Sequence, residues 1–200
     1  MSGEFPISLD PENISIRSDI DSVQSISQSG KRYSRVLGGH LWRLSITLPE
    51  LTRREGQLLY SFLLSQRGTH DTFTILVNGF RTPIGNNAGQ SPTYSGYTND
   101  NQITAANFGS SIQDAVVAGD LFTIAGSEKV YMITEDADSD GSGNCNLKFH
   151  PEIVQIPAGG AAITFSDVRM TVALDGQFPP LVKSGFFCQQ YKFDVIEAIA

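Results

Sequence analysis

The sequence is poor in the residues that build reactive or metal-binding sites. It has three histidines, two cysteines and one tryptophan among 200 residues. We interpret His40, His70 and His150 as turn or surface residues, because one stands in a glycine turn, one follows the expected helix and one precedes a proline. Cys145 and Cys188 are far apart and lack metal-ligand spacing. This favours two reduced thiols in a protein made in the cytosol, with a disulfide as the alternative.

Other absences exclude whole classes of protein. No serine stands in a G-x-S-x-G elbow, and no glycine-rich loop carries the lysine that would bind a phosphate. No apolar stretch approaches the roughly 20 residues of a membrane span. The first residues have neither the cationic end nor the apolar run of a secretory signal. We therefore expect no enzymatic activity, no cofactor and no membrane insertion.

The charge is low and acidic, with 18% charged residues and a net charge of −7. This argues against a general nucleic-acid binder, which needs a basic face to replace counterions, and against docking on anionic lipid. Positive charge is nevertheless concentrated at Lys31, Arg32, Arg35 and Arg43. Three interpretations stay open for these residues. They form a nucleic-acid patch, solvated strand faces, or an interface with acidic residues on a copy of the same protein.

One convincing helix is predicted, and it lies between two strands in residues 41–77. Residues 41–48 and 73–77 alternate apolar and polar side chains, which is the period of a half-buried strand. Thr52 and Glu55 have the spacing of a capping box, so we expect a helix over 52–67 that ends at Arg67-Gly68. The apolar stripe predicted to face the sheet is Leu58, Leu59, Phe62 and Leu63.

Short strands are predicted elsewhere in the chain. Ser29-Gly30 is expected to join two strands of one hairpin, and Gly38-Gly39 to turn into the Trp42 strand. A long final strand over 186–199 is expected to pair beside the Trp42 strand. The other predicted strands are 14–17, 23–28, 31–36, 121–124, 130–134, 145–149, 153–157 and 162–165.

These elements predict a mainly β fold, a β-sandwich that carries one α-helix and an inserted small β-barrel module. Residues 1–77 and 169–200 would form the sandwich, and residues 78–168 the insert. The insert begins with a predicted loop, 78–107, whose Tyr94 and Tyr97 stand among Ser, Gly and Asn. That composition suits either a contact surface or a mobile surface loop.

Two further segments each have two interpretations. The first dozen residues form an apolar arm in which Phe5, Ile7 and Leu9 alternate. The arm is either a first strand of the chain's own sandwich or a strand that docks on a neighbouring subunit. Asp136, Asp138 and Asp140 precede Gly141 and begin like a calcium loop, but the twelfth position is Leu147 and no helix flanks it. We therefore expect an acidic hairpin loop, with these three aspartates as weak metal candidates.

Two stretches resemble a known family. Residues 16–75, from IRSDIDSVQS to THDTFTI, carry a short hairpin, a G-G-x-x-W strand, L-P-x-L-T-R-x-E, a helix that ends in x-Q-R-G, and F-x-I. This series resembles the N-terminal part of tail-tip proteins of long-tailed, siphovirus-like bacteriophages, most of all the distal tail protein. Residues 118–153, with G-D-x-F-x-I-x-G and an acidic turn before a strand, resemble a small β module of phage structural proteins. The two stretches do not include a large separate carbohydrate-binding-like domain.

The resemblance implies a virion structural protein without catalytic residues. It implies a ring, commonly of six subunits, that connects the tail tube to the tip hub and to tape measure or fibre proteins, and that is assembled in the host cytoplasm. Its expected oligomer or partner contacts are Tyr94, Tyr97, Arg32, Arg35 and Arg43. The alternative function is a glycan or host-surface binding module of a virion, with the tyrosines and the acidic loop as contacts.

Overall fold

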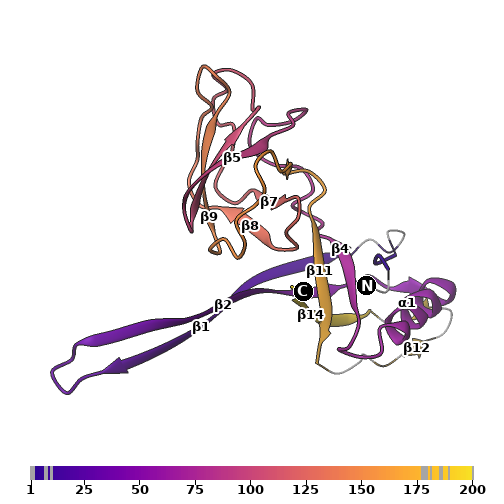
Figure 1. Ribbon diagram of the computed structural model, residues 1–200. Helices are drawn as coiled ribbons and strands as arrows, with labels where there is room; N and C mark the ends of the chain where they lie inside the picture. The colour runs from indigo at the N-terminus through magenta and orange to yellow at the C-terminus, as the bar shows by residue number, and fades with distance from the viewer. Residues whose placement is uncertain are drawn as a thin grey trace. The chain divides into compact units, whose positions relative to one another are not determined.

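The computed structural model describes residues 3–6, 9, 11–176, 180, 182–184, 187–188 and 190–199. The described part is mainly β with one helix, which confirms the predicted fold class (Figure 1). Its elements are β1 (Asn13–Ile26), β2 (Arg32–Thr47), β3 (Leu51–Thr52), α1 (Arg53–Ser65), β4 (Thr72–Leu76), β5 (Thr93–Asn99), β6 (Gln102–Ala106), β7 (Leu121–Ile124), β8 (Val130–Ile133), β9 (Cys145–His150), β10 (Ile163–Thr164), β11 (Arg169–Asp175), β12 (Lys183–Ser184), β13 (Phe187–Cys188) and β14 (Lys192–Glu197).

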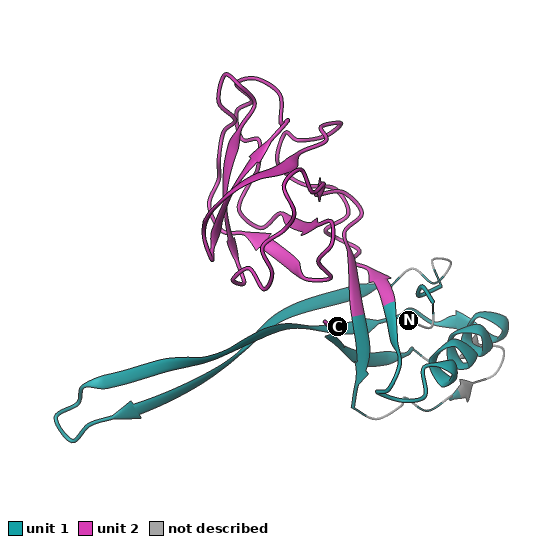
Figure 2. Ribbon diagram, viewed as in Figure 1, with its two compact units in different colours: residues 1–73, 172–198 teal, residues 74–171, 199–200 magenta. Residues whose placement is uncertain are grey.

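The chain divides into two compact units (Figure 2). Unit 1 comprises residues 1–73 and 172–198, and unit 2 comprises residues 74–171 and 199–200. The sheet of unit 1 has the strand order β1-β2-β14-β11-β4, to which unit 2 contributes the parts of β4 and β11 beyond the boundary. A smaller sheet has the order β12-β13-β3.

The Trp42 strand is the centre of unit 1. The side chains of Trp42, Leu44 and Ile46 are buried, as their alternation predicts. β14 lies antiparallel beside this strand, from Lys192 opposite Thr47 to Ile196 opposite Arg43, so the predicted pairing of the final strand is confirmed. The single long strand predicted over 186–199 is wrong, because β13 pairs with β3 while β14 pairs with β2. Phe186 and Gln189 lie outside the described residues.

The capping box of the helix is confirmed. The Thr52 hydroxyl accepts from the Glu55 amide, and the Glu55 carboxylate accepts from the Thr52 amide at 2.8 Å. Helix α1 buries Leu59 and Leu63, whereas Leu58 is exposed, so the predicted stripe was one residue too wide on that side. The reason is that residues four apart share a helix face, whereas adjacent residues point about 100° apart.

The N-terminal arm packs in the core of unit 1. Phe5 and Leu9 are both buried. The Phe5 ring lies 5.9 Å from Phe62 on α1, edge to face, and the Phe62 ring lies 5.3 Å from Phe73 on β4. Phe5 and Leu9 therefore pack within their own unit, as the first interpretation of the arm expects, but the described residues form no strand before β1. Ile7 lies outside the described residues.

Unit 2 contains a curled six-stranded sheet with the order β10-β7-β8-β9-β6-β5. Its two edge strands are joined by backbone hydrogen bonds, with the Tyr94 amide donating to Ala161 at 2.8 Å and the Ile163 amide donating to Pro92 at 2.9 Å. The sheet thus closes around an apolar core. That core includes Phe108, Phe122, Tyr131, Leu147, Phe149 and Phe165.

Two expectations for this unit were wrong. The segment 78–107 is not a continuous loop, because it holds the β5–β6 hairpin. The sequence pattern did not predict these strands, because they are polar and because two register irregularities interrupt β5. The segment 153–157 forms no strand, and Val154 and Ile156 on it are exposed.

The connection into the barrel is fixed by a buried carboxylate. Asp120 accepts from the backbone amides of Ile84 at 2.7 Å and Gly85 at 3.1 Å. A Cβ on Gly85 would meet the Ala115 carbonyl and the Val116 Cα at 2.8 Å, so only glycine permits this approach. Asp120 therefore serves the fold of the barrel.

Candidate functional site

The most unusual surface of unit 1 is the hairpin of β1 and β2. These strands pair from Asn13 opposite Thr47 to Ile26 opposite Arg32, in one continuous ribbon (Figure 1). The predicted separate strands 14–17, 23–28 and 31–36 are therefore parts of two long strands. The turn at Ser29-Gly30 is confirmed, with the Ser27 amide donating to the Lys31 carbonyl at 2.9 Å and Gly30 at φ 77°.

The hairpin has two halves with different surroundings. We define the proximal half as residues 13–20 and 40–47, and the distal half as residues 21–37. The proximal half is covered on its β2 side by β14. β14 reaches only as far along β2 as Arg43, so the ladder that continues into the distal half has two strands. An isolated two-stranded ribbon is at best marginally stable in water.

The halves meet at an irregularity in the ladder. His40 pairs with Ile20 and Val36 pairs with Ser22, so three residues of β2 oppose Asp21 alone. Two of the three, Gly38 and Gly39, have φ of 95° and 74°. The predicted Gly38-Gly39 turn is wrong, because the glycines lie inside β2 and form a bulge there.

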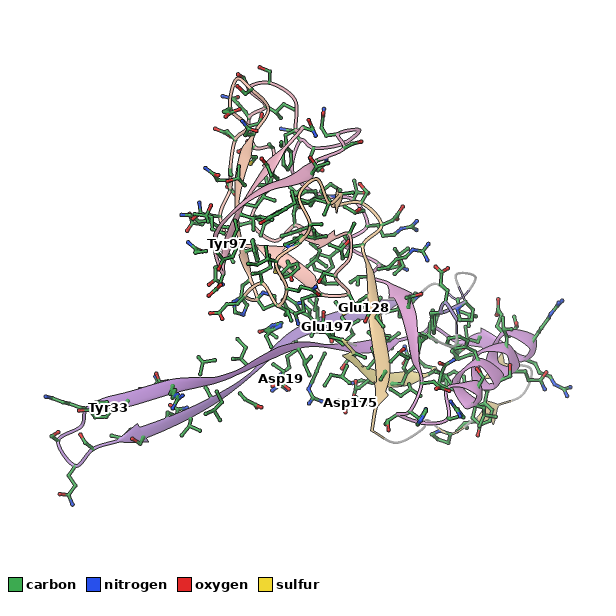
Figure 3. All side chains as sticks on the ribbon, viewed as in Figure 1. Asp19, Tyr33, Tyr97, Glu128, Asp175 and Glu197 are labelled. Carbon is green, nitrogen blue, oxygen red and sulfur yellow. The ribbon has the colours of Figure 1, made fainter. Side chains whose placement is uncertain are left out.

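The distal half exposes large apolar side chains. Residues 21–26 and 31–37 are all exposed, with Val23 at 56% and Ile26 at 73%. Its exposed large apolar residues are Val23, Ile26, Tyr33, Val36 and Leu37. Figure 3 shows Tyr33 near the tip of the hairpin. In the described part of the chain no third strand pairs with this ribbon, and such a concentration of exposed apolar side chains is typical of a surface that binds a protein.

The predicted cationic contacts fall into two groups. Arg32 and Arg35 lie in the distal half and are exposed. Arg43 lies in the proximal half, where its Nε donates to Asp19 on β1 at 2.6 Å and its Nη1 donates to Asp175 on β11. This hydrogen bond to Asp19 raises the pKa of Arg43 and lowers that of the carboxyl. Arg43 therefore links β2 to β1 and to β11 within its own sheet.

The two predicted tyrosine contacts also have different surroundings. Tyr94 is buried in the barrel core at 6% exposure, so a partner could reach little of it. Tyr97 is 43% exposed, and its hydroxyl donates to the Asp100 carboxylate. That hydrogen bond raises the pKa of the Tyr97 phenol.

The acidic loop directs its carboxylates to separate backbone amides. Asp136 accepts from Ala118 at 2.7 Å, and Asp138 accepts from Asp114 at 2.7 Å. Asp140 accepts from the amides of Ser142 and Asn144 at 2.8 Å, which lowers its pKa. Within the described ranges, no three His, Cys, Asp or Glu side chains are grouped so that they could hold a metal ion. The loop is stabilised by these internal bonds.

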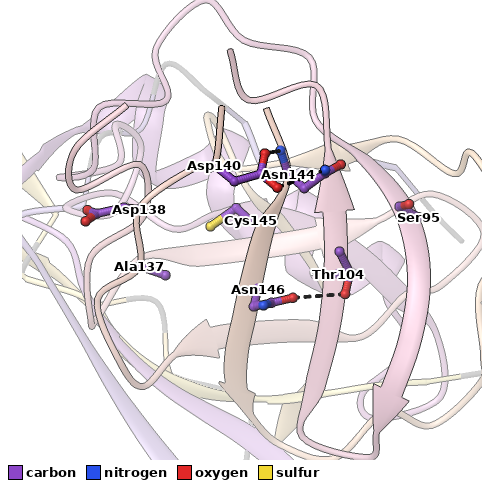
Figure 4. Close-up of a pocket in the computed structure, with 8 residues that line it drawn as sticks. All are labelled: Ser95, Thr104, Ala137, Asp138, Asp140, Asn144, Cys145 and Asn146. Atoms are coloured by element: carbon purple, nitrogen blue, oxygen red, sulfur yellow. Dashed lines mark hydrogen bonds between the residues drawn. The ribbon is translucent and has the colours of Figure 1, made fainter. Parts of the chain in front are cut away.

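A polar hollow of about 540 Å³ lies on the outside of the barrel (Figure 4). It is lined by Ser95, Thr104, Ala137, Asp138, Asp140, Asn144, Cys145 and Asn146. The Thr104 hydroxyl donates to the Asn146 amide oxygen at 3.0 Å. Burial raises the pKa of the Cys145 thiol to about 11, so it is protonated near neutral pH and is a poor nucleophile. The hollow therefore offers hydroxyl, amide and carboxylate groups rather than catalytic ones.

The sequence interpretation identified the distal cations but missed the apolar residues beside them. The available signal was the absence of a period of two in residues 22–26 and 32–36, where apolar side chains occur on both faces of the strand. In a sandwich strand one face would be consistently apolar. None of the described helices is long and apolar enough to cross a membrane.

The comparisons with known proteins find a similarity over part of the chain. Residues 81–168 match the family model "Distal tail protein pb9, B domain". The match lies within unit 2 and includes the barrel strands from β5 to β10. It confirms the resemblance to phage distal tail proteins, while residues 16–75 lie outside the matched segment. No curated protein matches the chain.

Proposed function

We propose that this chain, whose residues 81–168 match the B domain of distal tail protein pb9, is a ring-forming connector in the tail tip of a long-tailed bacteriophage. The family match supports a structural role in a phage tail. The finer proposal is that copies of the chain, six in the ring we expect, join the tail tube to the tip hub and to tape measure or fibre proteins. We further propose that the ring is assembled in the host cytoplasm.

The distal half of the hairpin is the feature that supports the proposed ring. Its strands extend past the end of β14, and among the described residues of unit 1 no layer covers its exposed apolar side chains. A subunit that packs against this ribbon would remove those side chains from water, at about 25 cal/mol for each Å² of apolar surface buried. A copy of the same chain satisfies this requirement in a closed ring, because each subunit then both gives and receives one hairpin.

The distal hairpin can be removed with little change to the rest of unit 1. Replacing residues 23–35 by Asn-Gly leaves Ser22 opposite Val36 as the closing pair of a two-residue turn. We expect the full-length protein to form a closed or concentration-dependent oligomer by native mass spectrometry and a ring in negative-stain images. The shortened variant should be a folded monomer.

A point variant gives the matched control. Leu64 on α1 has the same 56% exposure as Val23 on the hairpin. Leu64→Ser should leave assembly unchanged, whereas Val23→Ser should weaken it. A full-length protein that stays monomeric at every concentration, or a shortened hairpin that assembles like the full chain, would contradict the proposal.

A second candidate function is glycan binding, which the polar hollow of the barrel favours. Its Thr104, Asn146 and Asp140 side chains present hydroxyl, amide and carboxylate groups of the kind that bind sugar hydroxyls. A glycan array tests this function. Binding by the wild-type chain that Asn146→Ala abolishes would support it. An array without any bound glycan, in a preparation that forms rings, would leave the connector as the function.

A further inference from the structure

The end of the barrel at the β5–β6 turn carries a second surface with both acidic and apolar groups. Tyr97 donates to the Asp100 carboxylate, and the Ile153 amide donates to the Asp100 carbonyl at 2.7 Å. These bonds hold the segment after β9 beside the turn. Tyr97 and Val154 are exposed there, and Figure 3 shows Tyr97 on the outside of the barrel.

This end of the barrel is also hollow. A cavity of about 390 Å³ lies beside the turn and is lined by Asn99, Asn101, Gln102, Thr134, Glu135, Lys148, Phe149 and His150. Inside it, Lys148 forms an ion pair with Glu135 at 2.6 Å. We name the surface formed by Tyr97, Asp100, Glu135, Glu152 and Val154, together with this hollow, the acidic barrel end.

The charges of the acidic barrel end and the distal hairpin are complementary. Residues 21–37 contain three basic side chains and one acidic side chain, Asp21, at the boundary with the proximal half. Residues 74–171 contain ten acidic and four basic side chains, so unit 2 carries most of the net charge of −7. Asp100, Glu135 and Glu152 on the barrel end outnumber the single cation Lys148. Opposite charges of this kind steer association and fix the register of an interface.

We propose that the distal hairpin of one copy docks on the acidic barrel end of a neighbouring copy. The docking deepens the proposed ring by naming the surface that receives the hairpin, and it rests on that function. Tyr33, Val23 and Leu37 pack on Tyr97 and Val154. Arg35, which lies opposite Val23 and on the same ribbon face as Tyr33, lies against Asp100 and Glu152.

The acidic loop of residues 136–140 is the competing acceptor. Its carboxylates accept hydrogen bonds from backbone amides, as Asp100 on the barrel end accepts from Tyr97, so hydrogen bonding does not distinguish the two surfaces. Among the exposed large apolar residues of the described chain, none belongs to this loop. A ribbon rich in exposed apolar side chains gains little by docking there.

Photo-crosslinking of the full chain tests the docking. A photoreactive phenylalanine replaces Tyr33, and ¹⁵N-labelled and unlabelled chains are mixed before assembly. We expect crosslinks from position 33 to peptides that contain residues 97–102 or 152–156, with both isotopes in the pair. Crosslinks to unit 1, to residues 136–144 or only within one chain would overturn the docking, although the oligomer itself would still support the ring. Monomers without any crosslink would overturn the ring and the docking together.

Charge reversal provides an independent readout. Arg35→Glu and Glu152→Lys should each weaken assembly about tenfold, measured as the midpoint concentration by native mass spectrometry. The double variant should restore most of that loss. Arg54→Glu on α1 makes the same charge change away from the hairpin and should shift the midpoint by less than about twofold. A double variant that assembles no better than the weaker single variant would overturn the docking.

Discussion

The two halves of the β1–β2 hairpin share one ladder and differ in what covers them. In the proximal half, Trp42, Leu44 and Ile46 are buried on one face and β14 lies beside β2. In the distal half, side chains of the same types are exposed, and the ribbon has two strands. Apolar side chains alone therefore do not decide burial; a neighbouring strand and an opposing layer must be present. The comparison separates residues that stabilise the fold from residues available for assembly.

The largest loss of stability is expected from a substitution in the core of the proximal half. Leu44 is 1% exposed, so Leu44→Ala removes buried methyl groups and leaves a cavity. We expect the free energy of unfolding to fall by about 2–5 kcal/mol. Urea denaturation followed by circular dichroism measures it. A loss below about 1 kcal/mol would show that the proximal half is not the core of unit 1.

The second largest loss of stability is expected at the boundary between the two halves of the hairpin. Gly38 has φ of 95° and no atom within 4 Å of an added Cβ, so Gly38→Ala is strained by the backbone alone. We expect a cost of about 1–2 kcal/mol in the free energy of unfolding. Gly96→Ala is the matched control: it also has an uncrowded Cβ position, with Thr104 Cβ at 4.0 Å, and its φ is not positive. Equal stability losses in both variants would contradict a conformational role for Gly38.

The ion pairs of Arg43 give a smaller effect that depends on pH. Its partners are about one-third exposed, so solvent screening keeps the loss of stability from Arg43→Ala small at pH 7. The hydrogen bond from Arg43 lowers the pKa of Asp19, so the folded state holds fewer protons than the unfolded chain. That stabilisation is present above an unfolded pKa of about 3.9 and is lost as pH falls through the folded value.

Denaturation curves of wild type and Arg43→Ala at pH 7, 4 and 2.5 measure this dependence. The difference in unfolding free energy should be largest at pH 7 and should shrink toward pH 2.5. Lys192→Ala on β14 serves as a control for loss of a cation from the same sheet. A difference that grows as pH falls would exclude Asp19 as the partner that matters.

The sequence predicted the features that depend on local chemistry. The capping box of Thr52 and Glu55, the alternation of Trp42, Leu44 and Ile46, and the turn at Ser29-Gly30 all follow from spacing over a few residues. The resemblance to distal tail proteins also followed from short motifs, and the match over residues 81–168 confirms it.

The features that it missed depend on residues distant in the sequence. Gly38-Gly39 has the composition of a turn, and only the register with Ile20 and Ser22 shows that it is a bulge within β2. The polar β5–β6 hairpin is stabilised by β9, which pairs with β6 and is distant in the sequence. The exposure of Val23 and Ile26 also depends on distant residues, since it results from where β14 ends.

The smallest effect on stability is expected in the distal half. Val23 is 56% exposed, so Val23→Ser removes little packing within the chain, and the free energy of unfolding of the dilute monomer should change by less than about 0.5 kcal/mol. The same substitution should weaken assembly, because it removes an apolar group that the ring would bury. Urea denaturation of dilute protein and native mass spectrometry of concentrated protein separate the two quantities. If Val23→Ser destabilised the monomer as much as Leu44→Ala does, the distal half would be covered within its own chain, and the contrast between the halves would disappear.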